Sequence, residues 1–124
     1  MAGSASVETT DVDRGVVAKV NSDMDYVTCL DLWEPINEVL GGSAAFVVLD
    51  LSAVPFCDSA GLNLLLMASR QAASHEVELA LACVPASLMR LLKVTGIDQI
   101  LKAFDTVFEA ERALSRGCGG LNHR

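Results

Sequence analysis

The chain has 124 residues, 52% of them hydrophobic, which suits one domain with one continuous core. Its formal net charge is -7 and its nine basic residues are scattered, so the composition argues against nucleic acid as a partner. The apolar stretches 44–54 and 62–68 are shorter than the roughly 20 residues of a membrane span, and the first ten residues lack the pattern of a secretory signal. We therefore expect a cytoplasmic protein without a membrane partner.

The first predicted elements are the two strands of a β-hairpin. Residues 6–10 and 16–20 are rich in β-forming side chains and flank a polar turn with a glycine at 11–15. A polar loop with two acids follows at 21–25. The fold is therefore expected to open with two antiparallel strands.

The first predicted helix covers residues 29–40. Thr28 and Asp31 have the spacing of a capping box, and apolar residues recur at helical intervals after them. Pro35 lies inside this run, so the helix either starts later or is kinked, because an interior proline removes a backbone hydrogen bond. The glycine pair at 41–42 predicts its end.

Strands and helices then alternate. Residues 46–51 form a nearly continuous apolar run, which is typical of a central strand covered on both faces. A helix is predicted over 59–74 and a strand over 77–84, after which Pro85 and Gly96 have the residue types of a helix start and stop. The expected core face of the helix over 59–74 carries Leu62, Leu65, Leu66, Ala72 and Ala73.

The C-terminal quarter has weaker signals. Residues 100–104 are too short to classify, 106–108 are predicted as an edge strand, and 109–116 as a short helix. The glycine-rich segment 117–124 is predicted to be disordered. The order of elements predicts an α/β fold with a sheet that is mostly parallel at its centre.

Cysteines and histidines give no sign of a metal, cofactor or catalytic site. Cys29, Cys57, Cys83 and Cys118 form no C-x-x-C motif and have no histidine at ligand spacing. We expect the first three to be small, reduced core residues. Neither histidine accompanies a serine and an acid in a pattern typical of a hydrolase, and no glycine-rich phosphate loop with a lysine occurs. The sequence predicts no enzyme, no cofactor and no metal.

A motif at the start of the second predicted helix resembles a known family. Residues 56–65 read FCDSAGLNLL, and Asp50-Leu51-Ser52 ends the preceding strand six residues before Asp58. This arrangement resembles anti-sigma factor antagonists, the bacterial members of the STAS domain superfamily, in which Asp-Leu-Ser and Asp-Ser-Ser/Thr-Gly-Leu flank a short loop. The segment LLKVTGI at 91–97 resembles the end of a later helix of that family, and the loop 21–25 resembles its acidic loop in part.

The resemblance implies a fold and domain boundaries. It implies a STAS domain over residues 6–116, with a mixed β-sheet of four or five strands, an opening hairpin followed by a βαβα order, and helices packed on the sheet. Residues 1–5 are then expected to be a flexible N-terminus.

The resemblance also implies a function. Proteins of this family, when unphosphorylated, bind an anti-sigma factor that is a serine kinase, and so release a sigma factor in a partner-switching stress response. Phosphorylation of the serine after the motif Asp, here Ser59, switches binding off, and a phosphatase restores it. Two departures are Ala60, where Ser or Thr is usual, and the lack of Gly in the loop 21–25.

Candidate partner-binding residues follow from the motif and its surroundings. Leu64 and Met67 are expected on the exposed side of their helix, or in lateral packing against a neighbouring helix. Gly61 permits close approach of a partner or packing on the sheet, and Trp33 is expected in the core. Ser59 or Asp58 could alternatively be a plain helix cap, and the loop acids plain solvated residues. The complete candidate set is Asp58, Ala60, Gly61, Leu62, Asn63, Leu64, Met67, Asp23, Asp25 and Tyr26.

Two other functional classes remain open from the sequence. One is a non-phosphorylated STAS module, as a scaffold of a sensing complex or a component of a lipid transport system. The other is a small enzyme or carrier that uses the apolar core as a pocket. The first would bind its partner equally well with Ser59 replaced by Ala or Asp, and the second would show turnover or a co-purified ligand.

Overall fold

The computed structural model describes residues 5–120, with side chains described up to Ser115. Within that part of the chain, no helix has the length and apolar content needed to cross a membrane. The elements in order are β1 (Val7–Val12), β2 (Gly15–Val20), α1 (Tyr26–Leu40), β3 (Phe46–Asp50), α2 (Ser59–Ser74), β4 (Glu78–Ala82), α3 (Ala86–Thr95), the 3-10 turn η1 (Ile97–Gln99), β5 (Lys102–Phe104) and α4 (Val107–Gly120).

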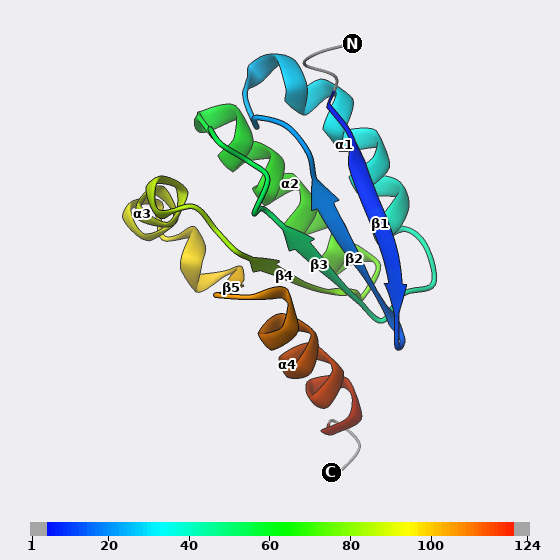
Figure 1. The fold of residues 1–124 in the computed structure, drawn as a ribbon. Coiled ribbons are helices and arrows are strands. Elements are labelled where there is room, and N and C mark those ends of the chain that lie inside the picture. The colour runs from blue at the N-terminus through cyan, green and yellow to red at the C-terminus, as the bar shows by residue number, and fades with distance from the viewer. Residues whose placement is uncertain (1–4, 121–124) are drawn as a thin grey trace.

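The five strands form one mixed sheet in the order β1-β2-β3-β4-β5. β1 and β2 are the predicted antiparallel hairpin, closed by the two residues Asp13 and Arg14, and the other three pairings are parallel. The chain adds β3 and then β4 on the same side of the sheet, and the connection between parallel strands is right-handed, so the connecting helices α1 and α2 lie side by side on one face. α4 packs against the other face (Figure 1). The predicted fold class, α/β with a mixed sheet and an opening hairpin, is confirmed.

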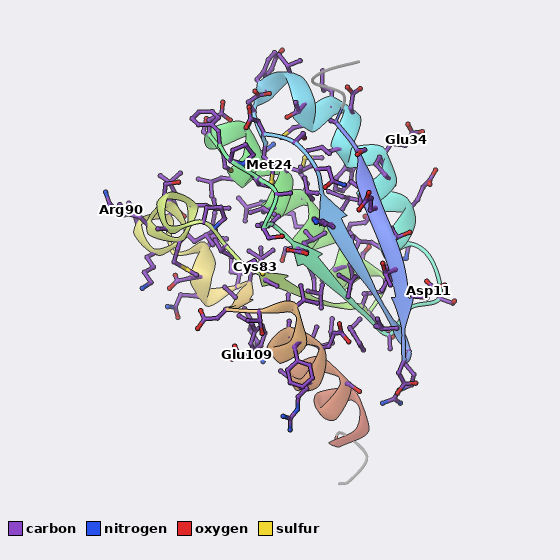
Figure 2. The ribbon with its side chains drawn as sticks, in the orientation of Figure 1. Asp11, Met24, Glu34, Cys83, Arg90 and Glu109 are labelled. Atoms are coloured by element: carbon purple, nitrogen blue, oxygen red, sulfur yellow. The ribbon has the colours of Figure 1, made fainter. Side chains whose placement is uncertain are left out.

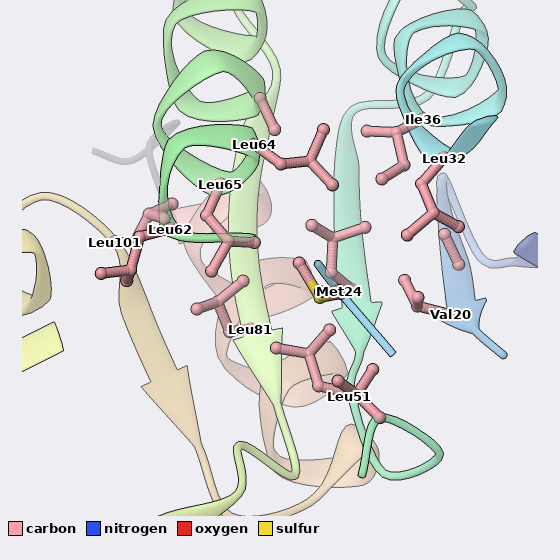
Figure 3. Close-up of a cluster of buried hydrophobic side chains, with 14 of the residues drawn as sticks. Val20, Met24, Leu32, Ile36, Leu51, Leu62, Leu64, Leu65, Leu81 and Leu101 are labelled. Atoms are coloured by element: carbon pink, nitrogen blue, oxygen red, sulfur yellow. The ribbon is translucent and has the colours of Figure 1, made fainter. Parts of the chain in front are cut away.

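β3 is the buried centre of the sheet, as its apolar run predicts. Val47 and Leu49 face the cluster below α1 and α2, whereas Phe46 and Val48 face the second cluster below α4. Both faces are therefore covered, which explains why the strand lacks a polar alternation. Figure 3 shows the larger cluster, in which Met24 points in below α2.

Three boundaries differ from the sequence prediction. α1 begins at Tyr26, earlier than expected, and runs through Pro35. The last strand is Lys102–Phe104, paired with β4, and not 106–108. The hydroxyl of Thr106 accepts a hydrogen bond from the Glu109 amide at 3.0 Å, so this segment starts α4.

The end of the chain also differs from the prediction. The backbone of α4 continues to Gly120, where the sequence predicted disorder from residue 117 onward. The rest of that prediction, for 121–124, and most of the expected flexible N-terminus fall outside the described residues. Ala5 itself is half-buried and packs against the larger core cluster.

Candidate functional site

The site lies where the parallel strands β2 and β3 end at the same edge of the sheet. The loops that follow them are joined by backbone pairing between Met24 and Cys57. The Met24 amide donates to the Phe56 carbonyl at 2.8 Å, and the Asp58 amide donates to the Met24 carbonyl at 3.2 Å. The acidic loop before α1 is thereby held against the loop before α2, as Figure 2 shows around Met24.

Asp25 caps α1, in place of the expected cap at Thr28. Its Oδ1 accepts from the amides of Val27 at 3.0 Å and Thr28 at 2.9 Å, while the Asp25 amide donates to the Thr28 hydroxyl at 3.0 Å. The backbone hydrogen bond from Thr28 holds the pKa of Asp25 below its ordinary value, because it stabilises the ionised carboxylate. Asp23 is half-buried, and its carbonyl accepts from the Thr28 hydroxyl at 2.6 Å. Both loop acids are therefore placed by the helix start.

Asp58 caps α2 and leaves Ser59 unengaged. Asp58 is half-buried, and its Oδ1 accepts from the Ala60 amide at 2.8 Å. Ser59 is the first residue of the helix and is exposed, and no hydrogen bond of its hydroxyl is found within the described part of the chain. Asp58 therefore caps α2, and the Ser59 hydroxyl faces solvent at the N-terminus of this helix.

Gly61 is fixed by packing within the domain. It is buried, and a Cβ at this position would lie 2.3 Å from the Cys57 sulfur and 2.7 Å from the Met24 carbonyl oxygen. Backbone cannot give way at that distance, so the residue must be glycine for α2 to start against the Met24 loop. The glycine is therefore required by packing against the Met24 and Cys57 loops, and not by the expected packing on the sheet.

A shallow apolar groove of about 260 Å³ runs between α1 and α2, beside Ser59. We call it the α1–α2 groove. Two exposed side chains stand on its α1 lip, Tyr26 at 75% and Leu30 at 74% exposure. Its lining residues are Tyr26, Cys29, Leu30 and Trp33 from α1, with Ala60, Asn63, Leu64 and Met67 from α2.

The groove decides between the two expectations for Leu64 and Met67, and it corrects the prediction for Trp33. Leu64, expected either on the exposed side or in lateral packing against a neighbouring helix, is only 2% exposed and points from α2 toward α1, so lateral packing is confirmed for it (Figure 3). Met67 is half-buried. The reason is lateral packing, because two adjacent helices on one sheet bury more than a single stripe of each. Trp33, expected in the core, is likewise only partly buried and forms part of the groove wall.

The structure brings most of the candidate residues together. Tyr26, Ala60, Asn63, Leu64 and Met67 line one groove, next to the Asp58 cap. Leu62 does not join them, since it is 9% exposed and turned into the core. Sequence reasoning missed Leu30 and Phe56, two exposed apolar side chains of this region. The spacing of Leu30, four residues after Tyr26, would have marked it had the helix start at Asp25 been recognised.

The cysteines near the site are packing residues. Burial, with the negative charge of Asp58 and Asp25 nearby, raises the pKa of the Cys29 thiol to about 11. Burial raises the pKa of Cys57 to about 12. Both side chains are therefore neutral thiols at pH 7 and weak nucleophiles. Among the described residues no cluster of three or more His, Cys, Asp or Glu side chains could hold a metal ion.

A five-stranded mixed sheet, with a serine exposed at the start of the helix after its central strand, defines a STAS-type α/β domain. The STAS domain family model matches residues 5–110. The chain therefore belongs to the STAS domain family.

Named relatives cover most of the chain. It is 29% identical over 107 residues to the anti-sigma-F factor antagonist RsfB of Mycobacterium tuberculosis, covering 86% of this chain and 87% of that protein. It is 25% identical over 96 residues to the anti-sigma-B factor antagonist of Staphylococcus aureus, covering 77% of this chain and 89% of that protein. The solved structure of an anti-sigma factor antagonist from Mycobacterium paratuberculosis superposes with a TM-score of 0.83 at 27% identity, covering 93% of this chain and 97% of that chain.

Proposed function

We propose that this protein is an anti-sigma factor antagonist whose unphosphorylated form binds an anti-sigma factor of the serine kinase type. Phosphorylation of Ser59 by that kinase weakens the complex, and a phosphatase reverses the modification. One observation carries the proposal: Ser59 is exposed at the start of α2, free of the capping role and beside the α1–α2 groove. The names of the relatives support the same class of partner.

The position of Ser59 suits a modification that alters binding without unfolding the domain. A phosphate there adds a charge of about -1.5 to -2 near the positive end of the α2 dipole, which tolerates it. The same charge stands beside Asp58 and next to an apolar groove. A partner that covers this surface must desolvate the phosphate or lie against like charge, and either effect weakens the complex.

The partner and the switch can be tested with one set of variants. The anti-sigma factor kinases of the source genome are purified and their affinities measured for the wild type, Ser59→Ala and Ser59→Asp. The control is Ser87→Asp, because Ser87 is also an exposed serine in the first turn of a helix at this edge of the sheet. We expect one kinase to bind the wild type and Ser59→Ala alike, and Ser59→Asp about tenfold or more weakly, a loss of about 1.4 kcal/mol. Ser87→Asp keeps the wild-type affinity.

Phosphorylation is tested separately by mass spectrometry. Incubation of the bound kinase with ATP should add one phosphate to the wild type and none to Ser59→Ala. Equal binding of wild type, Ser59→Ala and Ser59→Asp, together with no phosphate on Ser59, would contradict the switch and favour a passive STAS scaffold. Thermal unfolding of Ser59→Asp, expected near that of the wild type, excludes misfolding as the cause of weaker binding.

A further inference from the structure

The α1–α2 groove has the length and the walls to bind one short segment of a partner protein. Its lining spans two helical turns on each side, from Tyr26 to Trp33 on α1 and from Ala60 to Met67 on α2. At 1.5 Å per residue, seven residues correspond to a groove about 10 Å long. The floor between the lips contains Leu64, a member of the larger core cluster, and Cys29, which packs against that cluster.

The walls decide which backbone conformation an occupant can have. The walls are the first two turns of α1 and α2, in which the capping carboxylates of Asp25 and Asp58 and the pairing within each helix take up most of the backbone amide and carbonyl groups. An extended peptide needs backbone partners from a strand edge, and this groove offers none. A helix satisfies its own backbone and brings only side chains, so it fits a groove that offers only side chains.

The two lips of the groove differ in charge. α1 contains no Lys or Arg, and Asp31 and Glu34 are exposed on its outer side, beyond Leu30. Figure 2 shows Glu34 pointing away from the sheet on this side. On the α2 lip, the helical repeat aligns Ser59 and Asn63 with the exposed Arg70, the only charged residue of α2. Asp58 stands beside Ser59, whereas Arg70 lies about three turns farther along α2, past the groove. A complementary partner is therefore basic toward α1 and uncharged toward Ser59.

We infer that the α1–α2 groove receives an amphipathic helix of the partner, with its apolar face between Leu30 and Met67 and basic residues over Asp31 and Glu34. This rests on the proposed function, since it specifies how the anti-sigma factor meets that surface. The side of the helix that faces Ser59 is apolar, so binding would have to desolvate a phosphate on Ser59, which weakens the complex. A second copy of this chain fits less well, because two acidic α1 surfaces would meet.

The kinase complex tests the groove with a matched pair of variants. Leu30→Lys places a charge on the lip, and Val94→Lys places the same charge on α3, where Val94 is 78% exposed against 74% for Leu30. We expect Leu30→Lys to weaken kinase binding about tenfold or more, as for a central apolar contact, and Val94→Lys to leave it within about twofold. Hydrogen exchange of the kinase should show a protected helix with basic residues at the contact. Protection of an extended segment, or equal affinities of the two variants, overturns the inference.

A peptide titration tests the groove without the kinase. The probes are two synthetic helical peptides of about 15 residues with the same leucine stripe at i, i+3, i+4 and i+7, one with lysines and one with glutamates along one flank. Neither contains tryptophan, so Trp33, the only tryptophan of the chain, reports an occupied groove by its emission. We expect the lysine peptide to shift the emission of the wild type and Val94→Lys, but not of Leu30→Lys, and the glutamate peptide to shift none. No shift with the lysine peptide, or the same shift in all three proteins, overturns the inference.

The two proposals fail separately. If Ser59→Asp weakens kinase binding and Leu30→Lys does not, the switch stands and the helix-in-groove inference is wrong. If Leu30→Lys weakens binding and Ser59→Asp does not, the groove stands and the phosphorylation switch is wrong. If no kinase binds at all, the proposed function is wrong and the peptide titration still decides the groove.

Discussion

α2 and α3 begin at the same edge of the sheet and each has an exposed serine in its first turn, yet their surroundings differ. α2 has the side-chain cap of Asp58, whereas α3 begins after Pro85 with no side-chain cap. The third residue is the tightly packed Gly61 in α2 and the fully buried Leu88 in α3. A serine at a helix start is therefore ordinary. Two features distinguish Ser59. The loop that contains Met24 fixes the start of its helix in place, and an apolar groove lies beside it.

The largest effect that should separate the two helix starts is that of Gly61→Ala. The added methyl group would meet Cys57 and the Met24 backbone, so we expect a loss of about 2 kcal/mol in unfolding free energy, even though alanine favours helix. Urea denaturation measures it. Gly42→Ala is the control, because its Cβ would meet nothing closer than 3.5 Å, and it should stay within about 0.5 kcal/mol. A loss of unfolding free energy for Gly61→Ala as small as that for Gly42→Ala would show that the Met24 loop moves to make room for the methyl group.

The cap of α2 should give a smaller effect. Asp58→Ala removes the acceptor of the Ala60 amide and should cost about 1 kcal/mol, whereas Asp58→Asn retains a capping oxygen and should cost a few tenths. Ser87→Ala in α3, which has no side-chain cap to lose, should leave stability nearly unchanged. An Asn variant as unstable as the Ala variant would mean that the charge of Asp58, and not its cap, holds α2 in place.

The smallest expected effect concerns pH and the start of α1. The pKa of Asp25 is lower in the folded chain than its ordinary value of 3.8, so the folded state binds its proton less readily than the unfolded state. The carboxylate then stabilises the fold above pH 3.8, and this contribution is lost as pH falls through the lower folded pKa. We expect the wild type to exceed Asp25→Asn in stability at pH 6 and the difference to shrink below pH 3.8, in urea titrations at several pH values. A constant difference would contradict this.

Where local signals agreed with packing, the sequence predicted the fold well. The helix over 59–74 matches α2 residue for residue, and Gly96 ends α3 in the left-handed conformation that glycine favours. The start of α1 was missed because Asp25 and Thr28 form a capping box of unusual composition, three residues before the pair that the pattern selected. β5 was misplaced because three residues carry too little periodicity to identify a strand.

By itself, the sequence determined the α/β class, the opening hairpin and the buried central strand, because hydrophobic period and turn chemistry are local properties. It also placed Ser59 at a helix start through the Asp-Ser-x-Gly-Leu motif. Only the tertiary structure decided that Asp58 is the cap, that Gly61 packs against Met24, and that Leu64 is buried while Trp33 lines a groove. These outcomes depend on how α1 and α2 lie beside each other on the sheet. Contacts between segments that are distant in sequence produce no periodic pattern of hydrophobic residues, so the sequence alone does not predict them.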